Sequence, residues 1–557
     1  MTRRARSSCG MICAIAIMIG AHAEAETLSF QRTPDGGFEA LLDGFSDGPG
    51  CNPEFQPAAD IDIAGSTITI LSPEDATGCF LPYTAPPYRR VVELGALSEA
   101  RYDVVWMQPG LESVSRVLVP AAVGNLVANS DFDDGTTSWS AVNADGTIAI
   151  DAASGVPDAP SLHLVDESAQ SDCITVDDTV PVDVRALVKS DRGFADVSIQ
   201  PYSDAACTAP LDRLAAGSHA ANGIWQAIAL TDATLPSGTH AVRIVLGASG
   251  DVAGSGGDAH FDHVAFGQTG SVPDGIYVQQ AGLTGTWYDP STSGQGFEFV
   301  IGDGGAAAQP ALFGAWYTYT RAGSPSEQRW YSLQASAPVP GGPTGFTIFE
   351  NTGGDFDAPP VTTAEPVGSG TLAFYSCTSG LLTYSFENGD TGAIPIRRAM
   401  PDIGCDPRGV PLAPVASDFG FSGAWYEPET SGQGLIVEIN PALGQAFFGW
   451  YTYAVNGSTN AAHSQRWFSA QAPYEIGTRT IDLVLYATTG GAFDTPGGVT
   501  TVPVGTATLE FLDCTTATLA YSFASGELNG RSGTIALSRP FPQSPCPTDI
   551  EGANASR

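Results

Sequence analysis

The chain has 557 residues and carries 60 Asp and Glu against 23 Lys and Arg, a formal net charge of −37. Because binding to phosphate depends on clustered Lys and Arg, this balance argues against nucleic acid and anionic membrane surfaces as partners. At roughly 100–200 residues per domain, the length predicts about three to five domains. The 65 glycines and 40 prolines favour many short strands and turns over long helices.

The N-terminus has the features of a secretory signal peptide. Arg3, Arg4 and Arg6 precede an apolar stretch at 11–19, and small residues suited to cleavage follow, so we expect residues 1–23 to be removed. The apolar stretch is too short to span a bilayer, and no later stretch is long enough. The sequence therefore predicts a soluble protein that is secreted or periplasmic and has no membrane span.

Eight cysteines remain after the signal peptide, and they fall into neighbours 28, 34, 28 and 32 residues apart. This spacing predicts four disulfides, each worth roughly 3 kcal/mol in the chain-entropy model. The predicted pairs are Cys51–Cys79, Cys173–Cys207, Cys377–Cys405 and Cys514–Cys546. The alternative is metal binding, but the chain has no CxxC pair and few histidines, so zinc is not expected.

The first segment after the signal peptide, residues 26–120, contains alternating runs such as 66–70 and 102–106 between Gly, Pro and Asp turns. Such runs are typical of short half-buried strands, and they predict an immunoglobulin-like sandwich of about 95 residues. No residue in this segment indicates chemistry.

The next segment, residues 125–268, opens with NLVANSDFDDGTTSWS and closes with AHFDHVAFGQ. These ends resemble those of galactose-binding-like jelly rolls, which occur as carbohydrate-binding modules in secreted bacterial enzymes and adhesins. The residues that carry the resemblance are Asn125, Asn129, Asp131, Phe132, Trp139, Phe261, Asp262 and Val264. The resemblance implies a jelly-roll domain that binds glycan, with Trp139 and Trp225 in the core rather than on a sugar platform.

The same resemblance implies a structural calcium ion near the meeting point of the domain's two ends. Asp131 and Asp262 are the positions that it places there. Asn129, Asp131 and Asp133 offer oxygen ligands at alternate positions, but the run lacks the Gly and Glu of an EF-hand. A solvated acidic turn is the alternative interpretation, and it is the one we favour.

The C-terminal half contains an internal repeat. GLTGTWYDPSTSGQGFEF at Gly282 recurs as GFSGAWYEPETSGQGLIV at Gly420. Two domains of about 125 residues follow, at 282–405 and 420–546, joined by a Pro-rich linker at 406–417. Each copy divides into eight short β-rich segments, which predict an up-and-down antiparallel barrel, with a two-sheet sandwich as the main alternative.

Each copy also resembles the calycin superfamily of lipocalins and avidins. The resemblance is carried by a Gly-x-Trp on the first strand, at 285–287 and 423–425, and by an arginine on the last, Arg398 and Arg539. It implies that Trp287 packs with Arg398 and Trp425 with Arg539, closing one end of each barrel by cation–π contact.

The residues best suited to a ligand are the Gln-Arg-Trp triplets that both copies retain. They are Gln328, Arg329, Trp330, Gln465, Arg466 and Trp467. Aromatic faces beside directional donors suit a sugar or small polar ligand. The alternative, which we favour, is a structural role, because duplicated domains keep their core residues too. Asp357 and Asp494 are interpreted as turn residues.

No catalytic motif is found: no GxSxG elbow, HExxH, Walker A loop or GxGxxG that opens a helix. Among the histidines only His260 and His263 are close in sequence, and strand alternation places them on opposite faces. A paired Asp/Glu glycosidase site is not excluded by composition. We therefore expect no enzymatic activity, and calcium is the one cofactor considered.

These features together predict an exported all-β protein of four domains: an Ig-like sandwich, a jelly-roll sandwich and two tandem eight-stranded antiparallel barrels. Its expected role is binding or surface interaction, with a glycan or cell-surface component as the partner of the jelly-roll domain. One alternative is an extracellular hydrolase, or a hydrolase accessory protein, that uses the barrels. The other is a purely structural surface protein. The oligomeric state is left open.

Overall fold

The computed structural model describes most of the chain, with gaps. The described residues are 27–33, 36–45, 59–71, 87–107, 113–156, 159–250, 256–272, 275–276, 278, 280–292, 294–301, 312–322, 326–335, 343–401, 404–405, 417–455 and 464–540. The predicted signal peptide, Cys51, Cys79, Cys546 and the linker at 406–416 lie outside these residues.

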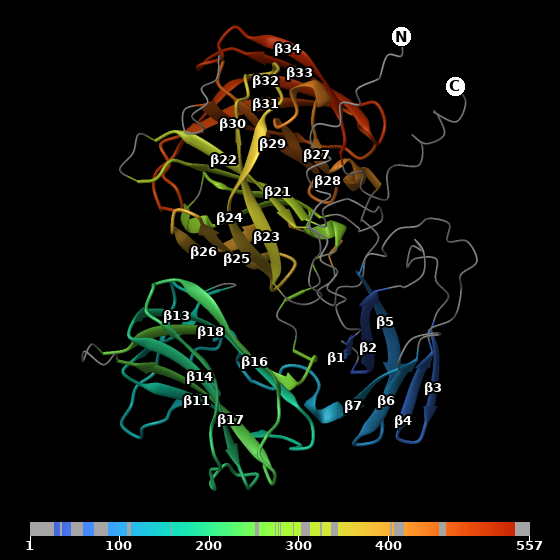
Figure 1. Cartoon of the computed structure of the whole chain (residues 1–557), viewed down its shortest axis with the longest axis vertical. Helices are drawn as coiled ribbons and strands as arrows, with labels where there is room; N and C mark the ends of the chain where they lie inside the picture. The colour runs from blue at the N-terminus through green and yellow to red at the C-terminus, as the bar shows by residue number, and fades with distance from the viewer. Residues whose placement is uncertain are drawn as a thin grey trace, which may run out of the picture.

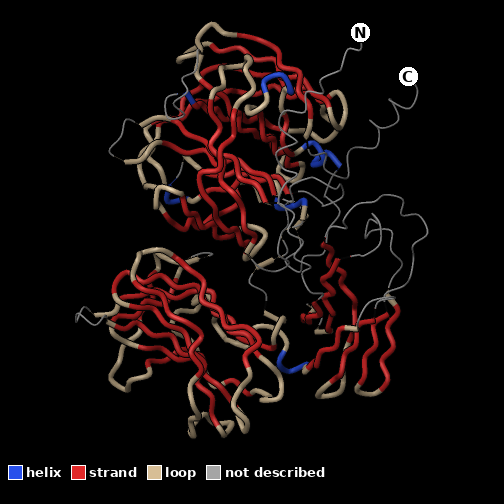
Figure 2. The backbone as a smooth tube through the Cα atoms, viewed as in Figure 1, coloured by secondary structure: helices blue, strands red, loops and turns tan. Residues whose placement is uncertain are grey.

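The described chain is all-β, as predicted, and strands make up most of the trace in Figure 2. Its helical segments are short 3-10 turns, such as Pro120–Ala122 and Ser417–Phe421. No helix in the described part of the chain is both long and apolar enough to cross a membrane. Figure 1 shows the first domain in blue, the second in cyan to green, and the two repeats in the upper half.

The first domain is a sandwich of two small sheets. One has the order β1-β2-β5 and the other β3-β4-β6-β7. The strands are β1 (Thr27–Arg32), β2 (Phe38–Phe45), β3 (Asp60–Ala64), β4 (Thr67–Leu71), β5 (Pro87–Gly95), β6 (Tyr102–Met107) and β7 (Val114–Leu118). Alternation decides the inward face: Tyr102, Val104 and Trp106 of β6 are buried in the core. The β4 and β6 strands run parallel, which the alternation alone does not indicate.

The second domain is a two-sheet sandwich that matches the predicted jelly roll. One sheet has the order β16-β13-β18-β10-β9, and the other β15-β14-β17-β11-β8, with β12 on β17. The strands are β8 (Trp139–Ala141), β9 (Ala149–Asp151), β10 (Ser161–Val165), β11 (Ser168–Ser171), β12 (Ile174–Thr175), β13 (Val182–Arg192), β14 (Phe194–Tyr202), β15 (Leu214–Ala220), β16 (Trp225–Ala233), β17 (Ala241–Ser249) and β18 (Asp258–Gln268). Phe132, Phe261 and Trp139 lie in the core between the sheets.

The two repeats form the predicted antiparallel barrels, in which each strand pairs with the next. The first barrel is closed by the pairing of its first and last strands, β19 and β26. Its strands are β19 (Gly285–Tyr288), β20 (Gly296–Ile301), β21 (Leu312–Tyr319), β22 (Gln328–Ala335), β23 (Thr344–Thr352), β24 (Thr363–Phe374), β25 (Ser379–Phe386) and β26 (Thr391–Arg398).

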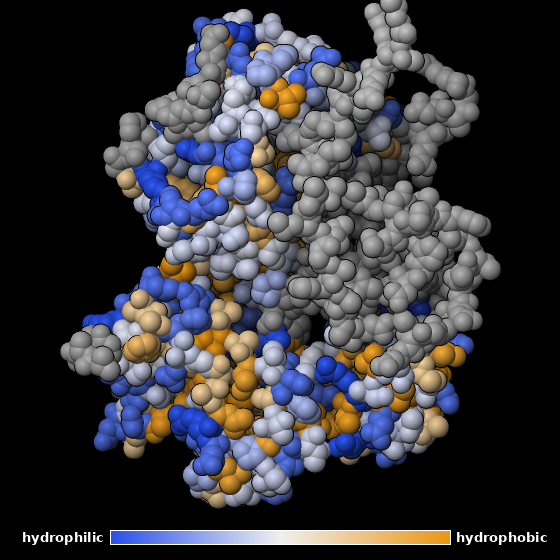
Figure 3. All heavy atoms as spheres, viewed as in Figure 1, coloured by the Kyte–Doolittle hydropathy of each residue, from blue (hydrophilic) through white to orange (hydrophobic). Residues whose placement is uncertain are grey.

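The second barrel is nearly closed, because a single bridge between Tyr426 and Ser538 joins its two ends. Its strands are β27 (Gly423–Trp425), β28 (Gly434–Asn440), β29 (Gln445–Tyr453), β30 (Gln465–Pro473), β31 (Thr480–Thr489), β32 (Thr500–Phe511), β33 (Thr516–Phe523) and β34 (Ser532–Ser538). Apolar side chains fill both interiors. Accordingly, Figure 3 shows mainly hydrophilic and neutral colours on the visible barrel surface.

The tryptophan and arginine pairs at the barrel ends lie as the calycin resemblance implies. The Arg398 guanidinium carbon is 5.6 Å from the centroid of the Trp287 ring, and that of Arg539 is 5.4 Å from the Trp425 ring. Each indole donates to a backbone carbonyl four residues upstream, at 3.1 Å. These four side chains are therefore structural.

The two barrels exchange loops. Phe356, in the loop between β23 and β24 of the first barrel, is buried in the core of the second barrel. In return, Phe493, in the loop between β31 and β32, lies in the core of the first. The neighbouring Asp357 accepts a hydrogen bond from Tyr521 Oη at 2.5 Å, and Asp494 accepts one from Tyr384 Oη at 2.8 Å. Each barrel is completed by the other.

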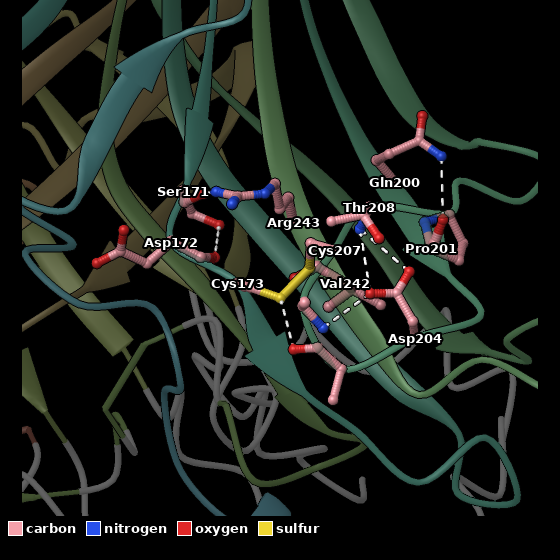
Figure 4. The surroundings of a disulfide bond; sticks show 12 residues. Ser171, Asp172, Cys173, Gln200, Pro201, Asp204, Cys207, Thr208, Val242 and Arg243 are labelled. Atoms are coloured by element: carbon pink, nitrogen blue, oxygen red, sulfur yellow. Dashed lines mark hydrogen bonds between the residues drawn. A yellow bond between two sulfur atoms is a disulfide. The ribbon is translucent and has the colours of Figure 1, made fainter.

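Two of the predicted disulfides are confirmed by the described residues. Cys173 bonds to Cys207 and Cys377 to Cys405, with Cα atoms 6.0 Å and 5.7 Å apart. Cys514 is also disulfide-bonded, while its predicted partner lies outside the described residues. Figure 4 shows the first of these bonds, which ties the loop after β14 to the segment before β12.

Candidate functional site

One outer face of the jelly roll carries a row of polar side chains, which we call the polar sheet face. It is formed by the outward residues of β14 and their neighbours on β17. These residues are Phe194, Asp196, Ser198, Gln200, Arg243 and Gly247. They share a face because alternate residues of a strand point the same way, while Ala195, Val197 and Ile199 point into the core.

Phe194 lies at one end of this face and is 38% exposed. Among the residues whose side-chain exposure is described, it is the most exposed phenylalanine, tyrosine or tryptophan. Aromatic rings normally bury most of their area, so a single exposed ring beside polar groups is unusual. It offers an apolar surface on which a ligand can stack.

Asp196 lies two residues further along the strand, and its surroundings partly exclude water from the carboxyl. Burial raises the pKa of Asp196 above its usual range, although the charge of Arg213 lowers it. Gly247, directly opposite on β17, makes room for it: a Cβ there would lie 2.6 Å from Asp196 Oδ1. Asp196 is thus a partly desolvated acceptor on this face, next to Ser198 and Val245, which are only 4% and 1% exposed.

The rest of the row supplies further donors and acceptors. The buried Ser198 hydroxyl has no hydrogen-bond partner in the protein. Gln200 accepts from Arg213 Nε at 3.1 Å and donates to the Leu211 carbonyl at 2.8 Å, so its amide is held in place. Arg243 donates to the Ser171 carbonyl at 2.5 Å beside the Cys173–Cys207 bond, which bounds the face at this end (Figure 4).

The outer face of the opposite sheet carries a second cluster, of histidines and aspartates. His163 of β10 and His260 of β18 lie directly opposite each other in the register, and their rings stack with centroids 4.4 Å apart. Asp258 Oδ1 lies 2.8 Å from His163 Nε2. Burial lowers the pKa of His260, and the nearby charges of His163 and Lys189 lower it further.

The residues predicted to bind calcium lie near each other, where the first loop of the jelly roll meets β18. Asp131 Oδ1 is 2.8 Å from His263 Nδ1, and Asp131 Oδ2 accepts from Ser130 at 2.7 Å. Asp262 is fully buried and accepts the backbone N–H groups of Val156 and His263, at 2.7 Å and 2.8 Å. Burial raises the pKa of Asp262 to about 9, and the charges of Asp131 and Asp133 add to this rise.

The fit of this pair to calcium is incomplete. Each of the four carboxylate oxygens already lies against a nitrogen or hydroxyl of the protein, whereas calcium takes six to eight oxygen ligands. The Asn129 side-chain amide donates hydrogen bonds to the carbonyls of Gly135 and Thr137, both at 2.9 Å, and so stabilises the turn. Asp131 and Asp262 are the residues that would hold the ion.

The Gln-Arg-Trp triplets of the two barrels meet at the interface between the barrels. Each triplet makes matching hydrogen bonds to the other. Gln328 donates to the Trp467 carbonyl and Gln465 to the Trp330 carbonyl, both at 2.8 Å. Each indole donates across the interface as well, Trp330 to Thr452 and Trp467 to Thr318, at 3.1 Å.

The arginines of the triplets contact carboxylates of their own barrels. Arg329 pairs with Glu350, and Arg466 Nε donates to Glu527 Oε2 at 2.7 Å. All six triplet side chains thus have protein partners, and the structural interpretation accounts for their retention. Their binding of a ligand stays a prediction.

Sequence reasoning did not find the polar sheet face or the His163 cluster. His163 and His260 are far apart in the sequence, so only strand pairing brings them together. The prediction that His260 and His263 lie on opposite faces is not confirmed, because a bulge in β18 interrupts the alternation, and Phe261 and Val264 both point into the core. Both histidines therefore lie off the core face, where His263 contacts Asp131 and Tyr375, and His260 stacks on His163. Trp139 is in the core as expected, but Trp225 is buried against Leu381 of the first barrel. Alternation within β14 was the available signal for the polar sheet face.

Neither a scan against models of protein families nor a search of curated proteins finds a match for this chain. Among solved structures, it is similar to the CBM22-2 xylan-binding domain of Paenibacillus barcinonensis Xyn10C. That match has 16% identity and a TM-score of 0.21, and covers 25% of this chain and 98% of that domain. A CBM22-1–GH10 structure of Clostridium thermocellum xylanase 10B matches at 14% identity and a TM-score of 0.21, over 29% of this chain and 32% of that one.

Proposed function

We propose that this protein is an exported, non-catalytic glycan-binding protein whose jelly-roll domain binds oligosaccharide along the polar sheet face. The observation that carries the proposal is the exposed Phe194 ring in line with the partly desolvated Asp196 carboxyl. A sugar ring presents an apolar face and a rim of hydroxyls, which match an aromatic platform beside directional acceptors. Gln200, which is half-buried, extends these polar contacts along the strand.

The shape of the face favours a chain of sugars over a single one. At about 3.3 Å per residue, the row from Phe194 to Gln200 extends over roughly 20 Å. The net charge of −37 disfavours anionic glycans, because long-range repulsion opposes their approach. We therefore infer a neutral oligosaccharide as the ligand class. The disulfides support export, since such bonds persist in oxidising compartments.

The first test compares the full chain with a Phe194→Ala variant for binding to neutral polysaccharides, by affinity electrophoresis and calorimetry. We expect the variant to bind roughly tenfold more weakly, equivalent to about 1.4 kcal/mol, because it loses the stacking surface. Phe194 is exposed, so its loss leaves the fold intact. Val165→Ala is the matched control, because Val165 is 49% exposed on the other sheet.

Two further measurements sharpen this test. Asp196→Asn is expected to weaken binding too, because a neutral amide is a poorer acceptor for sugar hydroxyls. Binding measured with and without calcium shows whether the predicted Asp131 and Asp262 site contributes. Equal affinity of wild type and Phe194→Ala for every glycan that binds would contradict the proposal.

The hydrolase alternative has one specific observation in its favour. Asp357 and Glu427 line a small cavity at the mouth of the second barrel, and burial raises the pKa of both carboxyls. Glycosidases use a pair of carboxyls, one of which acts as the acid and has a raised pKa. New reducing ends released from a bound polysaccharide, and lost in Glu427→Gln, would establish this alternative and overturn the non-catalytic part of our proposal.

A further inference from the structure

We propose that His163, Asp258 and His260 bind one divalent transition-metal ion with the ligand preferences of zinc. The site lies on the outer face of β10 and β18, on the sheet opposite the polar sheet face. It is therefore independent of the proposed glycan binding.

The backbone register brings these three residues together. His163 pairs directly with His260, and Asp258 precedes His260 by two residues, so both side chains of β18 point to the same face as His163. One ligand atom from each residue can be chosen so that all three lie within 4.8 Å of one another. Two imidazole nitrogens and one carboxylate oxygen are a ligand set that zinc takes in proteins.

Only a small adjustment is needed to reach bonding geometry. Zinc bonds of about 2.0–2.1 Å with tetrahedral angles place ligand atoms roughly 3.3 Å apart. The pair His163 Nε2 and Asp258 Oδ1, at 2.8 Å, is already that close. Rotation of the His260 ring would bring its nitrogen inward, while strand pairing holds the backbone.

The neighbouring charges favour a cation. Asp191 Oδ2 lies 3.3 Å from His260 Nε2, and Asp151 Oδ2 lies 3.7 Å from His260 Nδ1. These carboxylates can serve as a fourth ligand or orient the ring. Lys189 lies 3.3 Å from Asp191, and Arg192 lies 3.7 Å from Asp258. Three carboxylates against two cationic side chains favour a cation at the histidines.

The ion can reach the site from solvent, because the side chains of His163 and Asp258 are 30% and 28% exposed. Two imidazoles select a borderline-soft metal over calcium or magnesium, which prefer oxygen ligands throughout. The site is thus chemically distinct from the calcium position predicted at Asp131 and Asp262.

The test uses the full chain without an affinity tag, freed of metal by chelation and dialysis. Zinc is titrated by calorimetry, and cobalt is added as a spectroscopic probe of coordination. We expect one saturable high-affinity equivalent and visible cobalt bands typical of four-coordination. His163→Ala should weaken zinc binding roughly tenfold or more, because it removes one ligand. His219→Ala, which changes a half-buried histidine on β15 that is outside the cluster, should not.

His163→Ala must keep the circular dichroism and melting behaviour of the wild type for its loss of affinity to count. Asp258→Asn is the second variant, which keeps the side-chain volume but removes the carboxylate charge. The proposal is overturned if no saturable zinc binding occurs. It is equally overturned if the affinity and the cobalt spectrum are unchanged in both His163→Ala and Asp258→Asn.

Discussion

Asp262 shows how one residue combines structural and electrostatic roles. Its carboxyl is fully buried at the start of a bulge in β18 and accepts two backbone N–H groups, which hold the loop at Val156 against the strand. Burial with two other aspartates nearby raises its pKa to about 9. The carboxyl is therefore protonated in the folded state at neutral pH, and it is ionised in the unfolded chain.

The sign of the resulting pH dependence follows from linkage. Because the folded pKa of Asp262 is raised, its contribution to stability is full below about pH 4 and is lost as the pH rises towards about 9. We expect the stability of wild type relative to Asp262→Asn to fall between about pH 5 and about pH 9, as measured by urea unfolding. A relative stability that stays constant over this range would contradict the assignment.

Asp177 provides the control with the opposite sign. Hydrogen bonds from Thr179 lower its pKa, so its contribution is lost only on acidification below the usual carboxyl range. Asp177→Asn should therefore show a flat difference from wild type over the same pH interval. Repeating the Asp262 series with calcium tests the calcium prediction, since a bound cation would stabilise the ionised carboxyl and reduce the slope.

At the scale of elements, the loops between β23 and β24 and between β31 and β32 decide how the barrels are filled. Asp357 and Asp494 have φ values of 46° and 42°, which confirms that they are turn residues. The sequence alone does not reveal where these turns insert. Phe356 packs on Trp450 with ring centroids 5.4 Å apart, and Phe493 packs on Trp316 at 5.1 Å.

We expect Phe356→Ala to destabilise the second barrel, although the residue belongs to the sequence of the first. Removing a buried phenylalanine leaves a cavity and costs about 3–5 kcal/mol. Chemical denaturation followed by tryptophan fluorescence measures the loss, because Trp450 borders the cavity. Val361→Ala in the same loop, where the valine is 48% exposed, should change the stability by no more than about 0.5 kcal/mol. Equal effects of the two substitutions would argue against the exchanged-loop arrangement.

At the scale of the whole molecule, the two barrels form one body whose internal symmetry is imperfect. Glu438 of the second barrel reaches Arg398 of the first, with Oε1 and Nη2 3.0 Å apart and both side chains 1% exposed. The corresponding Glu298 instead accepts from Tyr451 Oη at 2.6 Å, and Arg539 donates to the carbonyls of Ser422 and Cys514. Burial raises the pKa of Glu298 to about 8, and the charge of Glu438 adds to this rise, with no cationic side chain of the described residues to oppose it.

This asymmetry predicts different costs for two similar substitutions. Glu438→Ala should destabilise the protein by about 3–5 kcal/mol, because it leaves Arg398 buried without its partner. Glu298→Gln should be close to neutral below about pH 4 and should become stabilising relative to wild type as the pH rises from about 4.5 towards about 8, since the unfolded chain ionises this carboxyl and the folded one does not. Urea unfolding at two pH values compares the variants. Comparable losses for both at every pH would contradict the asymmetric interface.

The sequence by itself determined the all-β class, the barrel duplication and two of the predicted disulfides, Cys173–Cys207 and Cys377–Cys405. Alternation and turn residues are patterns of a few neighbouring positions, and they specify where strands begin and end. In an up-and-down barrel each strand pairs with the next, so the same local patterns also specify the strand pairing. The Trp287–Arg398 contact was implied by the calycin resemblance of the repeats, and the structure confirms it.

Only the tertiary structure decided the loop exchange, the meeting of the Gln-Arg-Trp triplets and the juxtaposition of His163 with His260. Each depends on contacts between segments far apart in the chain, where burial and register choose the partners. The polar sheet face is predictable only in part. Alternation in β14 specifies which of its residues point outward, but the desolvation of Asp196 depends on the tertiary structure around it. Local pattern therefore specifies which face a side chain joins, and packing decides what it meets there.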